Sequence, residues 1–246
     1  MGFDFRNCEV LVTGGTRGIG YGVAKQFAEA GASVTITGTR PSASDYEQPL
    51  DAFRYIRCRL SSEEDVASLA DSIDTLDVLV NNAGQSRPEG ASEWEPRTFQ
   101  QVVDVDLVGP YRVTEACLPA LKKSVQVGGA SVINNLSLTV FFGEPLVPAV
   151  GAAKAGLWQL TKTMALQWAA DGIRVNGVVP GLIMTDFAAA LDKDPERKAA
   201  FLTRIPMQRF GTPADVANVV LFLASAESAW ITGTSIVVDG GQLARN

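Results

Sequence analysis

Short runs of apolar and β-branched residues alternate with longer amphipathic segments along the whole chain. Short apolar runs bounded by turn residues are typical of buried strands, and apolar residues at helical spacing indicate helices. The strands expected from these runs are Val10–Thr13, Ser33–Thr37, Phe53–Leu60, Leu76–Val80, Ser131–Leu136, Arg174–Val179 and Ser235–Val238. Helices are expected between them, over residues 21–31, 63–73, 97–122, 150–170 and 215–224. Because strands that alternate with helices form a parallel sheet covered on both faces, we predict one doubly wound α/β domain over residues 1–246, with seven strands in the order 3-2-1-4-5-6-7.

The first strand leads into a glycine-rich turn, TGGTRGIG (13–20), and then into a helix. Glycine allows a tight turn and lets a ligand approach without meeting a Cβ, while free N–H groups at a helix start bind phosphates. A strand, a glycine turn, a helix and a second strand form the first unit of a dinucleotide-binding fold. The alternative, a merely flexible glycine turn, is disfavoured by the flanking strand and helix. The candidate cofactor contacts in this turn are Gly14, Thr16, Arg17, Gly18, Ile19 and Gly20.

The residues after the second strand bear on the choice of cofactor. A fold that binds NAD usually has an acidic residue here, which holds the ribose 2′-OH. This chain has Thr39 and Arg40 instead, and Arg17 adds a second positive charge. Guanidinium groups match phosphate oxygens, so we predict that NADP(H) is preferred over NAD(H). The alternative is that Arg40 is a solvated loop residue.

Composition excludes several other classes of function. The net charge is −6, and binding to nucleic acid or to an anionic membrane needs a basic surface. The chain has no histidine, which excludes imidazole acid–base chemistry and the commonest metal ligand. Its 3 cysteines lack metal or disulfide spacing, and no secretory signal or membrane span is visible. We therefore expect a cytoplasmic protein without metal, nucleic-acid or membrane partners.

Further segments carry a family resemblance. They are LDVLVNNAG (76–84), the interval from Ser137 to Lys154, IRVNGVVPG (173–181), GTPADVANVVLFLAS (211–225) and ITGTSIVVDGG (231–241). With the glycine turn, their order and spacing resemble the short-chain dehydrogenase/reductase family over essentially the full chain, and its 3-oxoacyl-carrier-protein and polyol/steroid ketoreductases in particular. The resemblance implies a Rossmann fold, NAD(P)(H), a small carbonyl or alcohol substrate and a homotetramer.

The resemblance also assigns roles to individual residues. Ser137 would orient the substrate carbonyl, and Lys154 would hold the nicotinamide ribose and lower the pKa of a catalytic tyrosine. The remaining cofactor contacts that it implies are Asn82, Ala83, Gly84, Pro180, Gly181, Ile183 and Thr185. Residues 183–210, with helical patches and two prolines, are expected to form a substrate lid. The residues expected to line an apolar substrate region, with core packing as the alternative, are Phe141, Phe142, Leu182, Met184 and Phe187.

The chain departs from the family pattern at three positions. The catalytic tyrosine of the family lies thirteen residues after the serine and four before the lysine, and Val150 stands there. Asp106 replaces the asparagine of the family's fourth helix. Arg59 replaces an acidic residue that usually follows the third strand. Valine has no proton to give, and loss of a positioned general acid lowers a rate by about 10²–10⁴-fold.

Three interpretations of the missing phenol remain open. The protein is an atypical NADPH-dependent oxidoreductase with another proton donor, a catalytically impaired cofactor-binding scaffold, or a catalyst of redox-neutral elimination or isomerisation. For the first, the candidate donors are Glu144, Asp106 and a water held by Ser137 and Lys154. The alternative for Glu144 is a solvated loop charge. The alternatives for Asp106 are a local pair with Lys154 and a helix residue whose backbone carbonyl does the family's work.

The helix that starts near Val150 is rich in small residues, namely Gly151, Ala152, Ala153, Ala155 and Gly156. Small residues allow close helix packing, and the family resemblance implies a helix–helix dimer face here. The alternative is ordinary packing of this helix on its own sheet. The tail Ile236–Asn246 would supply a second interface, so we predict a tetramer of D₂ symmetry.

Overall fold

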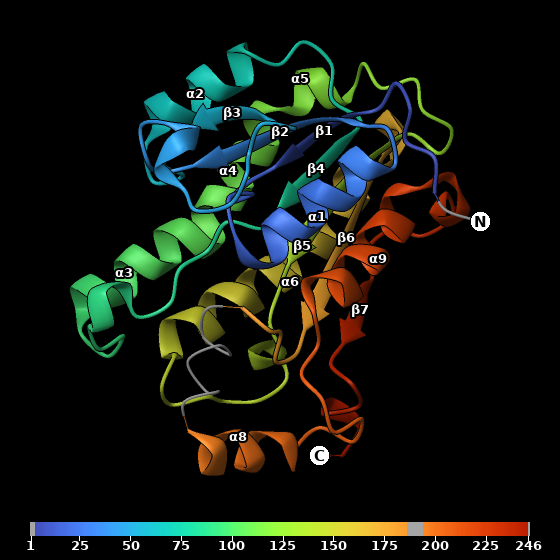
Figure 1. The fold of residues 1–246 in the computed structure, drawn as a ribbon. Helices are drawn as coiled ribbons and strands as arrows, with labels where there is room; N and C mark the ends of the chain where they lie inside the picture. The colour runs from blue at the N-terminus through green and yellow to red at the C-terminus, as the bar shows by residue number, and fades with distance from the viewer. Residues whose placement is uncertain (1–2, 186–193, 246) are drawn as a thin grey trace.

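A parallel sheet forms the centre of the molecule (Figure 1). The computed structural model describes residues 3–185 and 194–245. Within them, 7 strands lie in the order β3-β2-β1-β4-β5-β6-β7, and every neighbouring pair is parallel. The strands are β1 (Glu9–Val12), β2 (Ser33–Gly38), β3 (Arg54–Arg57), β4 (Val78–Asn81), β5 (Ala130–Asn135), β6 (Ile173–Pro180) and β7 (Ser235–Val238). The predicted single-domain α/β fold and strand order are confirmed.

Helices cover both faces of this sheet, as a doubly wound fold requires (Figure 1). Alternate residues of β1 face opposite layers: Val10 and Val12 pack in the cluster that contains α1 and α9, and Leu11 packs in the other. The first layer consists of α1 (Gly18–Glu29) and α9 (Pro213–Ala224), and the second of α2 (Glu63–Asp71), α4 (Gly109–Ala116), α5 (Leu118–Leu121) and α6 (Pro148–Trp168). None of the described helices is long and apolar enough to cross a membrane.

The helix predicted over residues 97–122 is broken. The chain forms α3 (Pro96–Val103), one π turn over Asp104–Val108, then α4 and α5. The N–H of Gly109 reaches back to the carbonyl of Asp104, and Pro110 has no N–H to continue the ordinary helical ladder. The third strand is also shorter than predicted: it ends at Arg57, and it begins at Arg54 because Phe53 lies in a turn closed by the carbonyl of Leu50.

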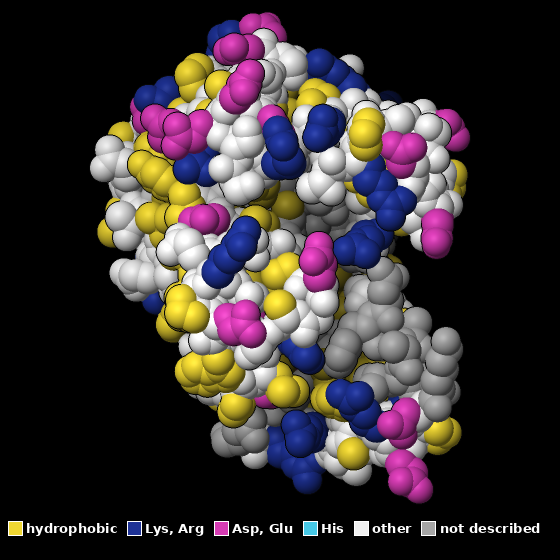
Figure 2. Space-filling model, turned by 90° about the vertical axis from the view of Figure 1, so that its left-hand side faces the viewer, with side chains coloured by type: hydrophobic (Ala, Val, Ile, Leu, Met, Phe, Trp, Pro, Cys, Tyr) yellow, Lys and Arg dark blue, Asp and Glu magenta, His cyan; other side chains and the backbone are white. Residues whose placement is uncertain are grey.

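The segment predicted as a lid is described only in part, because residues 186–193, including Phe187, lie outside the described residues. After the gap, α8 (Pro195–Leu202) lies away from the sheet and next to the C-terminus (Figure 1). Buried Ile205 and Phe210 pack with Leu182 and Met184, so these two expected substrate-lining residues contribute to a small core of their own. Figure 2 shows the face of the molecule that lies on the left in Figure 1, where charged side chains of both signs are interspersed with apolar ones.

Candidate functional site

The glycine turn between β1 and α1 lies directly against the carboxyl end of β4. Gly14 has a φ of 64°, and a Cβ there would lie 2.8 Å from the Cα of Ala83, so glycine is required. Thr13 Oγ1 accepts hydrogen bonds from the N–H groups of Asn82 (3.0 Å) and Ala83 (3.1 Å). In return, Asn82 Nδ2 donates to the carbonyls of Thr13 and Gly14, both at 3.1 Å. The predicted turn residues and the predicted β4-end residues therefore meet where the strand order reverses, as a dinucleotide site requires.

The amino terminus of α1 provides donors for an anion. The helix begins at Gly18, and the extended N-cap residue, Arg17, forms no side-chain cap to the first-turn N–H groups. A Cβ at Gly18 would lie 3.4 Å from Thr185 Cγ2, so the segment after β6 reaches the same place. Thr16 is buried, and Ile19 packs on the core beneath the turn. Uncapped N–H groups without an obstructing side chain fit a pyrophosphate.

Arg40 lies in an ordered loop after β2. Its guanidinium stacks 5.0 Å from the ring centroid of Tyr46 and donates to the carbonyl of Asp45. Its backbone N–H donates to the hydroxyl of Tyr46 at 2.9 Å. These contacts hold an exposed cation at the carboxyl end of β2.

A further arginine, Arg57, reaches the same loop and was not predicted. It ends β3, beside the end of β2, and its Nε donates to the carbonyl of Thr39 at 3.3 Å. It was missed because the predicted strand continues to Leu60, which puts Arg57 inside the strand, whereas β3 ends at Arg57. The guanidinium of Arg59, by contrast, forms a bidentate ion pair with Asp65, in which Nε donates to Oδ2 at 2.8 Å and Nη2 donates to Oδ1 at 3.0 Å.

Lys154 projects from α6 to the carboxyl end of β5. Its Nζ donates to the carbonyl of Asn135 at 2.9 Å and lies 3.4 Å from Asp106 Oδ2. The two residues are only 6% and 2% exposed. The local pair with Lys154, one of the alternatives for Asp106, is therefore present. Burial raises the pKa of the Asp106 carboxyl above its ordinary value, and the Lys154 ammonium opposes this rise.

The π turn explains how Asp106 reaches this position. A wider turn re-aims the side chains within it, and such turns recur at functional sites. Asp106 Oδ1 accepts a hydrogen bond from the N–H of Gln85 at 2.8 Å, and a Cβ at Gly84 would lie 2.9 Å from Asp106 Oδ2. The carboxylate therefore lies beneath the segment that follows β4, with both oxygens in contact with the protein.

The position four residues before Lys154 is occupied by half-buried Val150, in the first turn of α6. Ser137 follows the end of β5, and its Oγ accepts the N–H of Thr139 at 3.3 Å. Glu144 lies in the next loop, where its Oε1 accepts the N–H of Leu146 at 3.2 Å. The four tyrosines lie elsewhere, on α1, in the loop after β2, on β3 and on α4: Tyr21, Tyr46, Tyr55 and Tyr111.

Two buried polar atoms beside this site have no hydrogen-bond partner among the described residues: Asn135 Oδ1 and Thr139 Oγ1. Buried acceptors and hydroxyls without a partner are costly and indicate a bound donor or water. They lie on either side of Ser137 in the sequence. Together with the glycine turn, these atoms make the site fit a dinucleotide cofactor.

Glu93 is the principal site residue that sequence reasoning missed. It is 1% exposed, and its Oε2 accepts the N–H groups of Ala149 (3.0 Å) and Val150 (3.2 Å), which open α6. Its Oε1 accepts the N–H of Arg87 (2.9 Å) and the hydroxyl of Ser86 (3.3 Å). The carboxylate thus caps α6 from 56 residues away and fixes it to the loop after β4. No local pattern marks such a cap.

Replacing Glu93 with alanine is expected to lower the free energy of unfolding by about 2–3 kcal/mol, because buried N–H groups lose their acceptor. Urea denaturation followed by circular dichroism measures this change. Glu95→Ala is the matched control, since Glu95 is exposed and forms no side-chain cap, and it should alter stability by less than about 0.5 kcal/mol. Equal effects of the two substitutions would contradict the capping role of Glu93.

The predicted residues after β6 lie at the same edge of the sheet. Pro180 ends β6, the N–H of Gly181 donates to the carbonyl of Val238 at 2.9 Å, and Ile183 is buried and pairs with Gly211. Phe141 and Phe142 do not join Leu182 and Met184; they line a separate cavity with Glu144, which is described below.

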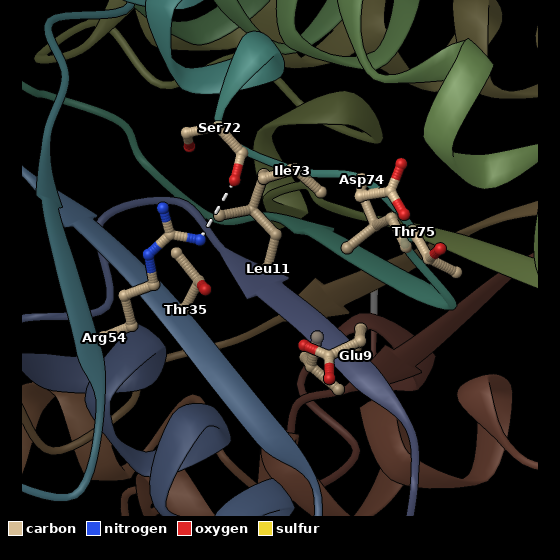
Figure 3. A pocket seen from close by; sticks show the side chains of 10 residues that line it. Glu9, Leu11, Thr35, Arg54, Ser72, Ile73, Asp74 and Thr75 are labelled. Carbon is tan, nitrogen blue, oxygen red and sulfur yellow. Dashed lines mark hydrogen bonds between the residues drawn. The ribbon is translucent and has the colours of Figure 1, made fainter.

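A further cavity, of about 390 Å³, lies at the opposite edge of the sheet, by the amino ends of β1 and β3 (Figure 3). Arg54 points across it and donates to the carbonyl of Ser72 at 3.1 Å. Glu9 and Asp74 also line it. The glycine turn and Lys154 are at the carboxyl edge, so this cavity is not part of the cofactor site.

Thiol and metal chemistry find no support in the described residues. Burial raises the pKa of Cys8 and Cys117 to about 12 and of Cys58 to about 11, so each thiol stays protonated at neutral pH. Within residues 3–185 and 194–245, no cluster of three acidic or cysteine side chains could hold a metal ion.

The fold and this site define a dinucleotide-binding α/β protein of the doubly wound class. A family model described as enoyl-(acyl carrier protein) reductase matches residues 14–242. The chain belongs to this family of short-chain dehydrogenases/reductases.

Relatives of several activities match over nearly the whole chain. A 3α-hydroxysteroid dehydrogenase of Mediterraneibacter gnavus is 34% identical, with 96% of each chain covered. The 3-oxoacyl-(acyl-carrier-protein) reductase of Aquifex aeolicus is 36% identical, covering 94% of this chain and 95% of the relative. A solved Agrobacterium tumefaciens protein with bound NADP, provisionally assigned as a 2-deoxy-D-gluconate 3-dehydrogenase, is 35% identical, with 99% of both chains covered and a TM-score of 0.85. These similarities support an oxidoreductase.

Proposed function

We propose that this protein is an NADP(H)-dependent oxidoreductase that interconverts a carbonyl and an alcohol without the tyrosine usual in its family. The observation that carries the proposal is the arrangement at the end of β5, where buried Lys154 is anchored on the carbonyl of Asn135 beside Ser137. This arrangement supports a ribose-binding role for Lys154 and a substrate-binding role for Ser137, at the edge of the sheet that also holds the glycine turn. When bound, the nicotinamide supplies or accepts the hydride.

The proton has to come from a group other than a phenol at position 150. Asp106 is a poor donor, because both of its oxygens already accept hydrogen bonds or face Lys154. Glu144 lies seven residues beyond Ser137, and its Oε1 accepts the N–H of Leu146 within its own loop. We assign the proton to a water molecule oriented by the Ser137 hydroxyl and the Lys154 ammonium. Such a donor is less effective than a positioned acid, so turnover is slow.

One observation favours a second function, a cofactor-binding protein that does not turn over. Val150 has no proton, and the charge of Lys154 is already compensated by Asp106 at 3.4 Å. A site of this kind can bind a dinucleotide without completing a reduction. NADPH binding without consumption across a broad carbonyl panel would favour this second function over the first.

The cofactor preference is the most direct test of the nucleotide site. We expect NADPH to bind roughly tenfold or more tightly than NADH, because Arg40 and Arg57 would form charge-assisted hydrogen bonds to the 2′-phosphate. Arg40→Ala and Arg57→Ala should each raise the Kd for NADPH about tenfold and leave the Kd for NADH within about twofold. Fluorescence titration of both cofactors measures this.

Arg54→Ala is the matched control, since Arg54 lies at the opposite end of β3 from Arg57. It should change neither dissociation constant. Tighter binding of NADH by the native protein, or equal loss of both cofactors in the two variants, would contradict the assignment of a 2′-phosphate site.

We also propose the homotetramer. Ala152 and Leu166 on α6 are exposed, with Leu166 85% accessible, which supports contact of this helix with a second copy. Ala153 is buried and a Cβ at Gly156 would lie 2.9 Å from Leu107, so part of the small-residue stripe serves the helix's own packing. The tail at Ile236–Asn246 is the proposed second interface.

A further inference from the structure

A cavity of about 730 Å³ lies between the loop that follows Ser137, the carboxyl end of α8 and the C-terminal tail. Small-molecule sites typically occupy about 300–1,000 Å³. Figure 1 shows α8 and the C-terminus side by side below the sheet. The cavity is lined by Phe141, Phe142, Gly143, Glu144, Thr203, Arg204, Gln242, Leu243 and Arg245.

Two guanidinium groups give this cavity its charge. Arg204 packs 5.8 Å from the ring centroid of Phe201, and Arg245 donates to the carbonyl of Thr203. A guanidinium has five N–H donors, so these contacts hold the groups without exhausting them. Among the residues that the structure describes, no carboxylate forms an ion pair with either arginine. With Glu144 as the acidic member of the lining, the cavity has a net positive charge suited to a monoanion.

A buried acceptor completes the polar lining. Gln242 Oε1 is inaccessible to solvent and has no hydrogen-bond partner among the described residues. Leaving such an oxygen unpaired is costly, and a hydroxyl donor would satisfy it. The walls are apolar, formed by Phe142, Leu243 and Phe141, whose ring lies 5.6 Å from that of Trp158. The cavity thus combines donors for an anion, an acceptor for a hydroxyl, and apolar sides.

We propose that this cavity binds the carboxylate end of a hydroxy acid, with Arg204 and Arg245 on the carboxylate and Gln242 accepting a neighbouring hydroxyl. Phe141 is four residues from Ser137, a chain distance of at most about 14 Å, so one loop serves both sites. In this proposal the ligand is the substrate of the proposed oxidoreductase, and its other end reaches Ser137. This inference rests on the proposed function and adds the class of substrate.

Calorimetric titration of the NADPH-loaded protein with D-gluconate tests the proposal. Gluconate is an alcohol, whose oxidation needs NADP⁺, so it binds to the NADPH-loaded protein without reacting. D-glucitol is the neutral probe of the same length. We expect gluconate to bind at least roughly tenfold more tightly than glucitol, because the charge-assisted hydrogen bonds are lost with the neutral ligand. Arg204→Ala and Arg245→Ala should each weaken gluconate binding about tenfold and leave glucitol unchanged. Gln242→Leu should weaken the binding of both gluconate and glucitol.

Arg6→Ala, an exposed arginine paired with Asp4 in the N-terminal segment, is the control and should bind gluconate like the native protein. Arg245 lies in the exposed tail, so its variant tests the proposal even if Arg204→Ala fails to fold. No gluconate binding, equal affinity for gluconate and glucitol, or gluconate affinity unchanged in both arginine variants would overturn it. Failure of NADPH to bind would instead contradict the proposed function, and the gluconate titration without cofactor would still decide the anion site.

Discussion

Replacing Val150 with tyrosine is expected to raise the rate of NADPH-dependent carbonyl reduction at least about tenfold, and combining it with Asp106→Asn is expected to raise it by about 10²–10⁴-fold over the native protein. A phenol at position 150 lies one helical turn before Lys154, on the same face of α6. It would supply a proton where the native side chain has none. Initial rates of NADPH consumption over a carbonyl panel measure the gain.

The double variant should exceed the single variant because Asp106 opposes the effect of Lys154. A nearby cation lowers the pKa of a phenol, and an anion 3.4 Å from that cation cancels much of its field. Asparagine removes the negative charge and keeps the shape of the side chain. The chain therefore differs from its family at two coupled positions.

Leu146→Tyr is the control, since Leu146 is 62% exposed in the loop that precedes α6 and a phenol there is not aligned with Lys154. It should leave the rate unchanged. If neither Val150→Tyr nor the double variant turns over any carbonyl, the pocket lacks a productive geometry for hydride transfer, and the cofactor-binding function is the correct one.

Replacing Lys154 with methionine is expected to lower the free energy of unfolding by about 3–5 kcal/mol, because it leaves the buried Asp106 carboxylate without its partner. Lys154→Met/Asp106→Asn should recover most of this stability and none of the turnover, since the ribose-holding cation stays absent. Urea denaturation measures the stability, and initial rates of NADPH consumption on the same samples measure the turnover. Equal stability of the single and double variants would contradict the charge pairing.

The difference in free energy of unfolding between Lys154→Met and Lys154→Met/Asp106→Asn should depend on pH. Burial raises the pKa of Asp106 above its ordinary value of 3.8, and in Lys154→Met no ammonium opposes that rise. A group with a raised pKa in the folded state gives stability that is fully present below its unfolded pKa and lost as the pH rises through the folded pKa. The free energy of unfolding of Lys154→Met should therefore approach that of Lys154→Met/Asp106→Asn near pH 3.8 and fall progressively below it toward neutral pH.

The fold could be predicted from the chain because its signals are local and periodic. Apolar runs mark the strands, Thr212 and Pro213 mark the start of α9, and a capping box with Asp215 is present there. The helix over 97–122 could not be placed correctly, because the apolar spacing continues through the π turn at Asp104–Val108 and only the backbone reveals the break.

The site was predictable where one segment carries the chemistry and not where distant segments meet. The glycine turn and Lys154 each belong to a motif of a few residues. Glu93 was missed because its partners Ala149 and Val150 are more than fifty residues away and are backbone groups, which leave no mark in the side-chain pattern. The cavity that contains Arg204 and Arg245 could not be predicted either, because its lining comes from three segments that are distant in the sequence.

Transfer of deuterium from C4-deuterated NADPH to a carbonyl substrate most directly tests whether this site performs hydride transfer without a phenol. The native protein should form an alcohol that carries one deuterium at the former carbonyl carbon, slowly, and Val150→Tyr/Asp106→Asn should form the same labelled product much faster. Tight NADPH binding with no label in the products of either protein would contradict the proposed oxidoreductase.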